Sequence, residues 1–222
     1  MPTWGLLRAG IAALALGAAQ LGAAAPVYDN GAPDQVYGTQ MSDAVVAEDF
    51  VLAAEAAITN LRFWSIQSAP ADYLGSVYWA IYSDAAGTPG GLLFGGITVP
   101  TTAVATGNST GFGYAEYVFD ADVLDFALGA GTYWLGLHNG PATSIDATEM
   151  LWSTTASVVG SESMYFDATS GWLGGGTHLA FALDGTFVGN PPPPPPTGAP
   201  EPGTLALVGL AVMAARVAHR KA

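Results

Sequence analysis

The sequence lacks cysteine and has very little positive charge. Its 222 residues contain no Cys and only five Lys and Arg residues, against 18 Asp and Glu. Without thiols the chain cannot form disulfides, carry out thiol redox chemistry or build a cysteine-ligated zinc site. A chain of this length can bury an adequate core without disulfides. We therefore expect one domain with appended segments.

The few positive charges are concentrated at the two ends of the chain. Four of the five basic residues lie there: Arg8, Arg216, Arg220 and Lys221. Residues 26–199 contain Arg62 and every acidic residue except Glu201, so 17 acidic side chains face one basic one, a net charge of −16. Such a surface repels phosphate backbones and anionic lipid, which excludes nucleic-acid binding as a function. It attracts cations and favours solubility.

Long hydrophobic runs are also missing, and the N-terminal run is short. Arg8 precedes the apolar residues 9–21, and small residues follow at 21–25. A charged start, a short apolar run and small residues are typical of a secretory signal peptide cut by signal peptidase. We predict such a signal helix at residues 1–25. The alternative is a buried N-terminal helix.

The C-terminal apolar run is shorter still. Residues 205–215 fall below the roughly 17–25 residues of a spanning helix. With snorkelling basic groups this run could just cross the membrane, and Arg216, Arg220 and Lys221 would stop it on the cytoplasmic side. Transient insertion into the inner membrane is therefore expected during secretion.

The order of features at this end resembles a known sorting signal. Pro200, Glu201 and Pro202 precede the apolar run and the basic tip, an arrangement similar to the PEP-CTERM signal of bacterial surface proteins, although Ala199 stands where valine is usual. The resemblance implies cleavage by a membrane protease-transpeptidase, exosortase, and delivery to the cell surface or the exopolysaccharide matrix. An ordinary tail anchor is the alternative. The preceding segment, 190–199, includes six prolines and is predicted to be an extended linker.

Residues 26–189 have the pattern of an all-β domain. Gly, Thr and aromatic residues are frequent, and turn signals recur about every ten residues. A Gly-rich stretch at 171–176 is predicted to be a hairpin turn. The Ala-rich stretch 44–57 has a helical alternative, but its β-branched residues favour a strand. Strands are predicted at 44–52, 57–66, 76–83, 92–99, 112–119, 131–138, 150–155, 163–167 and 178–187.

Alternation within these strands predicts which side chains share a face. Val77, Trp79 and Ile81 alternate with Tyr78, Ala80 and Tyr82; Tyr133, Leu135 and Leu137 alternate with Trp134, Gly136 and His138. The stretches Val46–Phe50, Asn60–Trp64 and 131–140 also resemble an extracellular module of surface proteins with a jelly-roll-like antiparallel β-sandwich fold, which implies a fold and leaves the ligand open.

No catalytic motif stands out in this domain. It has two histidines, His138 and His178, but no Gly-x-Ser-x-Gly elbow, no metalloprotease pattern and no phosphate-binding loop. The many carboxylates would permit a glycosidase pair, yet the sequence singles out none. We therefore expect a protein that is not an enzyme, with a polysaccharide hydrolase as the less favoured alternative.

Two binding hypotheses remain open. Oxygen ligands near the first and last strands could hold a structural calcium ion; the candidates are Asp29, Asn30, Glu48, Asp49 and Asp184. Solvated surface carboxylates are the alternative. Aromatic side chains on one sheet face could stack on the sugar rings of an exopolysaccharide; the candidates are Tyr78, Tyr82, Trp134 and His138. Ordinary cross-strand packing is the alternative there.

Overall fold

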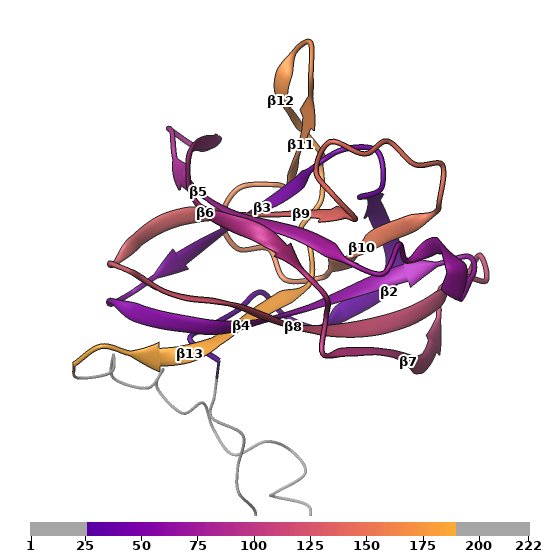
Figure 1. Cartoon of the computed structure of the whole chain (residues 1–222), viewed down its shortest axis with the longest axis horizontal. Coiled ribbons are helices and arrows are strands. Elements are labelled where there is room, and N and C mark those ends of the chain that lie inside the picture. Colours follow the sequence, from indigo (N-terminus) through magenta and orange to yellow (C-terminus); the bar gives the residue numbers. More distant parts are fainter. Residues whose placement is uncertain (1–25, 190–222) are drawn as a thin grey trace, which may run out of the picture.

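Two antiparallel β-sheets packed face to face make up residues 26–189, the part of the chain that the computed structural model describes (Figure 1). The all-β sandwich predicted from the sequence is thus confirmed. The helices predicted within 1–25 and 200–222, and the linker 190–199, lie outside the described residues.

The larger sheet is centred on the long strand β4. Its seven strands are β1 (Tyr28–Asp29), β2 (Pro33–Gln40), β4 (Ala56–Gln67), β7 (Thr102–Ser109), β8 (Ala115–Leu128), β10 (Met150–Thr155) and β13 (Phe181–Phe187). β8 pairs with one edge of β4, while β13 and β10 share the other edge. β1 pairs with β13, so the first and last strands of the described residues lie side by side.

The smaller sheet contains strands from the middle of the chain. Its order is β12–β11–β3–β9–β5–β6. The bounds are β3 (Val46–Leu52), β5 (Val77–Asp84), β6 (Pro89–Thr98), β9 (Gly131–Asn139), β11 (Met164–Asp167) and β12 (Gly171–Gly174). β11 and β12 form a hairpin that stands out from the body at the top of Figure 1. A three-residue 3-10 helix, η1 (Pro70–Asp72), joins the two sheets between β4 and β5.

The core lies between the sheets and follows the predicted alternation. Val77, Trp79 and Ile81 of β5 are buried in it, as are Leu135 and Leu137 of β9. The larger sheet contributes aromatic rings to the same core: Phe63, Phe119, Trp152 and Phe181. Complete burial of each such side chain stabilises the fold by about 1.5–3 kcal/mol. The sandwich is therefore held by hydrophobic packing, consistent with the absence of cysteine.

One tight turn illustrates how local sequence sets strand pairing. β5 and β6 are joined through Ala86 and Gly87, which have φ values of 58° and 84°, and the amide of Ala85 donates to the carbonyl of Thr88 at 2.8 Å. Two consecutive residues with positive φ match the twist of a hairpin. Gly87 adopts this conformation without the strain that a Cβ would add.

Most predicted strands are confirmed, with differences at the less regular elements. The Ala-rich stretch 44–57, for which a helix was the alternative, contains strand β3 and the start of β4. β1, β2, β7 and β12 were not predicted, because β1 has only two residues and the other three contain turn-forming Gly, Pro or Asn and do not alternate. The Gly-rich stretch predicted as a turn begins with β12, so that prediction was wrong; the turn lies at 168–170. β8 extends nine residues beyond the predicted end at 119.

Within residues 26–189, no helix has the length and apolar character needed to cross a membrane.

Candidate functional site

The four side chains proposed to bind sugar do share one face of the smaller sheet. Tyr78 is paired with His138, and Tyr82 with Trp134, in the register of β5 and β9. Since the opposite face of both strands enters the core, these four lie on the outer face of the sandwich. The alternation predicted from sequence is confirmed for this face.

This outer face is not an exposed platform, which corrects the sugar-stacking hypothesis. Trp134 and His138 are both 0% exposed. The indole Nε1 of Trp134 donates to Asp84 Oδ1 at 3.0 Å. Burial lowers the pKa of His138, and its Nδ1 lies 3.4 Å from the carbonyl of Gly140. These two side chains therefore serve packing and cannot stack on a polymer from solution.

One side chain of this outer face is covered by the hairpin of β11 and β12. The ring of Trp172 lies 5.4 Å from that of Tyr82 and 5.3 Å from that of Phe166, measured between centroids. Trp172 and Phe166 are cross-strand partners in the hairpin, whereas Tyr82 belongs to β5, three strands away from β11 in the sheet. Although the hairpin projects from the body, the ring of Trp172 thus packs against that of Tyr82 on the outer face.

A second cover is the loop that follows β9, and Asn139 fixes its position. This buried side chain donates to Ser42 Oγ at 2.9 Å and to the carbonyl of Asp72 at 2.7 Å, and it accepts from the amide of Leu74 at 3.0 Å. The loop itself is tied down where the amide of Asp146 donates to the carbonyl of Ser42 at 3.0 Å. The segments around 42, 72 and 140–149 are therefore held together by one amide group.

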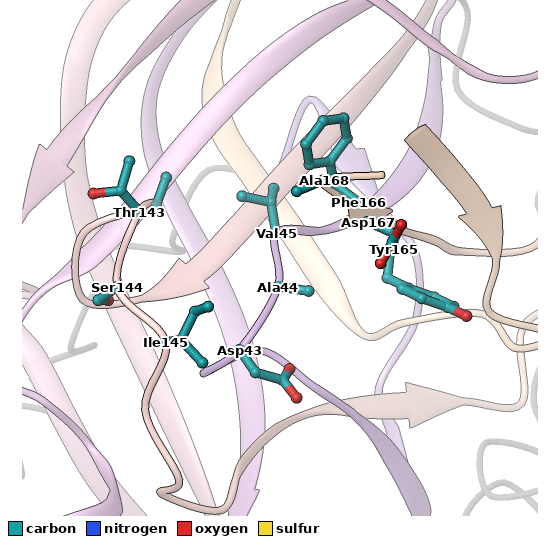
Figure 2. A pocket seen from close by; sticks show the side chains of 11 residues that line it. Asp43, Ala44, Val45, Thr143, Ser144, Ile145, Tyr165, Phe166, Asp167 and Ala168 are labelled. Atoms are coloured by element: carbon teal, nitrogen blue, oxygen red, sulfur yellow. The ribbon is translucent and has the colours of Figure 1, made fainter. Parts of the chain in front are cut away.

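A pocket lies between this loop and the hairpin. Its volume is about 530 Å³, within the range of sites that take small molecules. Figure 2 shows Ala44 and Val45 between the segment 143–145 on one side and the segment 165–168 on the other. Three stretches distant in sequence thus enclose it, and each is anchored by backbone hydrogen bonds; the amide of Phe166, for example, donates to the carbonyl of Val45 at 2.9 Å.

The lining combines aromatic, hydroxyl and carboxylate groups. Tyr165 and Phe166 are 37% and 45% exposed, and Ile145 is 85% exposed. Thr143 contributes a hydroxyl, and Asp43 a carboxylate on the exposed surface. Asp167 is a second carboxylate, whose pKa is lowered by hydrogen bonds from the amides of Ser170 and Thr169. Apolar rings beside polar groups suit a ligand with both kinds of surface.

The carboxylates proposed to bind calcium are not brought into one cluster. Glu48 and Asp49 are adjacent in β3 and point to opposite faces; Asp49 accepts from the amide of Ser161 at 2.9 Å. Asp184 accepts from Asn60 at 3.2 Å, and Asp29 from the amide of Gly31 at 2.8 Å. Among residues 26–189, no group of three or more His, Asp or Glu side chains is placed to hold a metal ion.

Glu48 is instead part of a buried polar network inside the sandwich. It is 0% exposed; its Oε1 accepts from Asn30 at 3.3 Å and lies 3.1 Å from His178 Nδ1. The hydroxyl of Tyr28 donates to Asn30 at 2.9 Å. Burial, and secondarily Asp49, raises the pKa of Glu48 to about 9. At neutral pH this carboxyl is therefore protonated, and the network joins β1, β3 and the residues before β13.

Sequence reasoning missed the pocket. Its polar residues Asp43, Thr143 and Asp167 lie in loops or at a strand end and belong to no motif. The one available signal was Tyr165-Phe166, two large consecutive aromatics in a strand. They point to opposite faces of β11, and both remain partly exposed in the projecting hairpin.

Comparison with known proteins identifies the C-terminal segment. Residues 199–221 match the family model described as the PEP-CTERM protein-sorting motif. The motif predicted from Pro200, Glu201, Pro202 and the basic tip is thus confirmed. It implies that the protein is exported, processed by an exosortase and sorted to the cell surface. A search among curated proteins found no match to the chain.

Proposed function

We propose that this chain is a non-catalytic protein of the cell surface or exopolysaccharide matrix, displayed there as its β-sandwich domain. The observation that carries the proposal is the sorting motif at residues 199–221 on a chain whose residues 26–189 form a folded body. Signal peptidase cuts within the small residues before Pro26, which would block cleavage directly after Ala25. The apolar run at 205–215 holds the chain briefly in the inner membrane, and an exosortase cleaves near Pro200–Pro202.

The test of sorting is the intact mass of the surface-associated protein in its producing cell. We expect a mass lacking the basic tip and the apolar run. A chain ending at residue 198, or one carrying Glu201→Ala, should fail to reach the surface or retain its full tail. Thr204→Ala, just outside the tripeptide, is the matched control and should be processed normally. A surface protein with its complete C-terminus would refute the proposed processing.

The absence of catalysis is supported by the chemistry of the pocket. Its lining contains no His or Lys, and the lowered pKa of Asp167 leaves that group ionised and unsuited to donate a proton at neutral pH. The two imidazoles of residues 26–189 lie outside the pocket lining. Purified protein incubated with the producer's own polysaccharide should release no new reducing ends. Release that disappears in Asp43→Asn would establish a hydrolase instead.

A second candidate function is binding of the matrix polysaccharide, favoured by the pocket. Tyr165 and Phe166 offer apolar rings, and Thr143, Asp43 and Asp167 offer hydrogen-bonding groups beside them. Sugars present apolar C–H surfaces together with hydroxyls, and such a lining can bind both. Retention of the protein on the purified matrix, lost in Tyr165→Ala but kept in Tyr37→Ala, an exposed tyrosine outside the pocket lining, tests this function.

A further inference from the structure

We propose that the pocket formed by segments 43–45, 142–145 and 165–168 takes an amino sugar with a free, protonated amine. This inference rests on the second proposed function, polysaccharide binding, and specifies the class of sugar. The pocket contains two carboxylates, Asp43 and Asp167, and its lining has no basic side chain.

The charge of the whole domain selects against acidic sugars. Arg62 is the one basic residue of positions 26–199, and it lies on the larger sheet, where its Nε is 2.7 Å from Asp120 Oδ1. No cation is therefore available in the pocket to pair with a uronate, sulfate or phosphate group. Bringing such a group near two carboxylates of a net −16 domain costs free energy through like-charge repulsion.

The same groups favour a cationic sugar. No hydrogen bond within the described residues engages the carboxylate of Asp43, so this group is open to a ligand. The carboxylate of Asp167 already accepts from the amides of Thr169 and Ser170 and from the side chain of Ser170, and it contributes negative charge to the pocket. Hydrogen bonds between an ammonium and a carboxylate are roughly twice as strong as neutral ones. Tyr165 and Phe166 lie on opposite faces of β11 and both line the pocket, so either ring can offer partly exposed apolar surface to the sugar.

The pocket is also built before a ligand arrives. Ser144 donates from both its amide and its hydroxyl to the carbonyl of Pro141, at 2.9 and 2.7 Å, and Asn139 fixes the base of the same loop. The opposite wall is held by the bond from the amide of Phe166 to Val45. A preformed wall lowers the entropic cost of binding a sugar.

Calorimetric titration of the full-length protein with four short oligosaccharides tests the inference. The probes are a glucosamine tetramer, its N-acetylated form, a neutral glucose tetramer and a uronic acid tetramer, each in physiological salt. At about pH 5.5, where the amine is protonated, we expect the glucosamine tetramer to bind at least about tenfold more tightly than the neutral ones. The uronic acid tetramer should not bind. Raising the pH until the amine is neutral should remove the preference.

Matched variants assign the effect to the pocket. Asp43→Asn should weaken glucosamine binding about tenfold and leave the weak binding of the neutral tetramer unchanged, because it removes charge and keeps shape. Asp125→Asn, an exposed carboxylate of β8 on the other sheet, should change neither. An equal loss in Asp125→Asn would show attraction to the overall charge and overturn the inference.

The remaining outcomes distinguish the amino-sugar specificity from polysaccharide binding in general. Equal affinity for glucosamine and glucose tetramers, abolished by Tyr165→Ala, would overturn the amino-sugar assignment and leave polysaccharide binding in place. Preferred binding of the uronic acid tetramer would also overturn the assignment. No binding of any tetramer would refute both.

Discussion

Two buried glutamate side chains differ in how well their carboxyl oxygens are hydrogen-bonded. Glu48 and Glu116 are 0% and 1% exposed. Both oxygens of Glu116 accept hydrogen bonds, from Thr106 and Asn108 at Oε1 and from Gln35 at Oε2. Glu48 Oε2 has no partner among the described residues. The bonds that Glu48 does accept only partly offset the effect of burial, and burial together with the nearby Asp49 raises its pKa.

The raised pKa of Glu48 predicts a specific dependence of stability on pH. The folded protein holds this proton up to about pH 9, whereas the unfolded chain releases it near 4.5. The stabilising contribution is therefore complete below about pH 4.5 and is lost as the pH rises toward 9. Glu48→Gln removes this loss, so at neutral pH it should raise the free energy of unfolding by about 1–3 kcal/mol relative to wild type.

The matched control is Glu116→Gln, which should have the opposite sign. In this variant the side-chain NH2 of glutamine would face a group that now donates a hydrogen bond to the carboxylate of Glu116. The variant should therefore be destabilised by about 1–3 kcal/mol. Urea unfolding of both variants at several pH values measures the two effects. Tyr28, Asp49 and His178 are titratable groups that adjoin Glu48. The decisive quantity is therefore the difference in free energy of unfolding between variant and wild type at each pH. A Glu48→Gln gain that does not grow with pH would contradict the raised pKa.

At the scale of elements, the loop after β9 depends on one buried side chain. Asn139 makes its hydrogen bonds to residues of three separate segments: Ser42, Asp72 and Leu74, and Thr148 at 3.4 Å. Asn139→Ala should destabilise the protein by about 1–3 kcal/mol, because it removes a buried hydrogen bond to Ser42 and leaves partly buried backbone groups of Asp72 and Leu74 without this partner. Hydrogen exchange should then accelerate in the amides of Asp146 and Thr148.

Asn108→Ala is the matched control for this prediction. Asn108 is exposed, and its side-chain amide donates one hydrogen bond, to Glu116 at 3.0 Å. Its loss should cost about 1 kcal/mol or less and leave exchange in residues 141–149 unchanged. Equal exchange in both variants would show that the loop does not depend on Asn139.

The sequence allowed the sheets to be predicted far better than the pocket. Alternation in β5 and β9 correctly separated Trp79 and Leu135 from Tyr82 and Trp134, because strand geometry is local. Alternation shows which side chains share a face but says nothing of a further layer, so the cover provided by Trp172 could not be foreseen. The pocket depends on loops that meet only in three dimensions, and Asp43 and Asp167 have no spacing that links them.

At the scale of the whole molecule, the dominant feature is uncompensated negative charge. Folding brings the carboxylates of residues 26–189 close together, and Arg62 alone offsets them, through Asp120 at 2.7 Å and Asp184 at 4.0 Å. Mutual repulsion of this kind destabilises a compact state.

This repulsion predicts that salt stabilises the protein. The screening length falls from about 30 Å at 0.01 M to about 3 Å at 1 M ionic strength, so the melting temperature should rise by several °C as NaCl is added across that range. A variant with Asp122→Asn and Asp125→Asn, two exposed carboxylates of β8, should melt higher at low salt and respond less to NaCl. If the melting temperatures of the two proteins rose in parallel with NaCl concentration, the cause would be the general strengthening of hydrophobic burial by salt, which does not depend on the number of carboxylates.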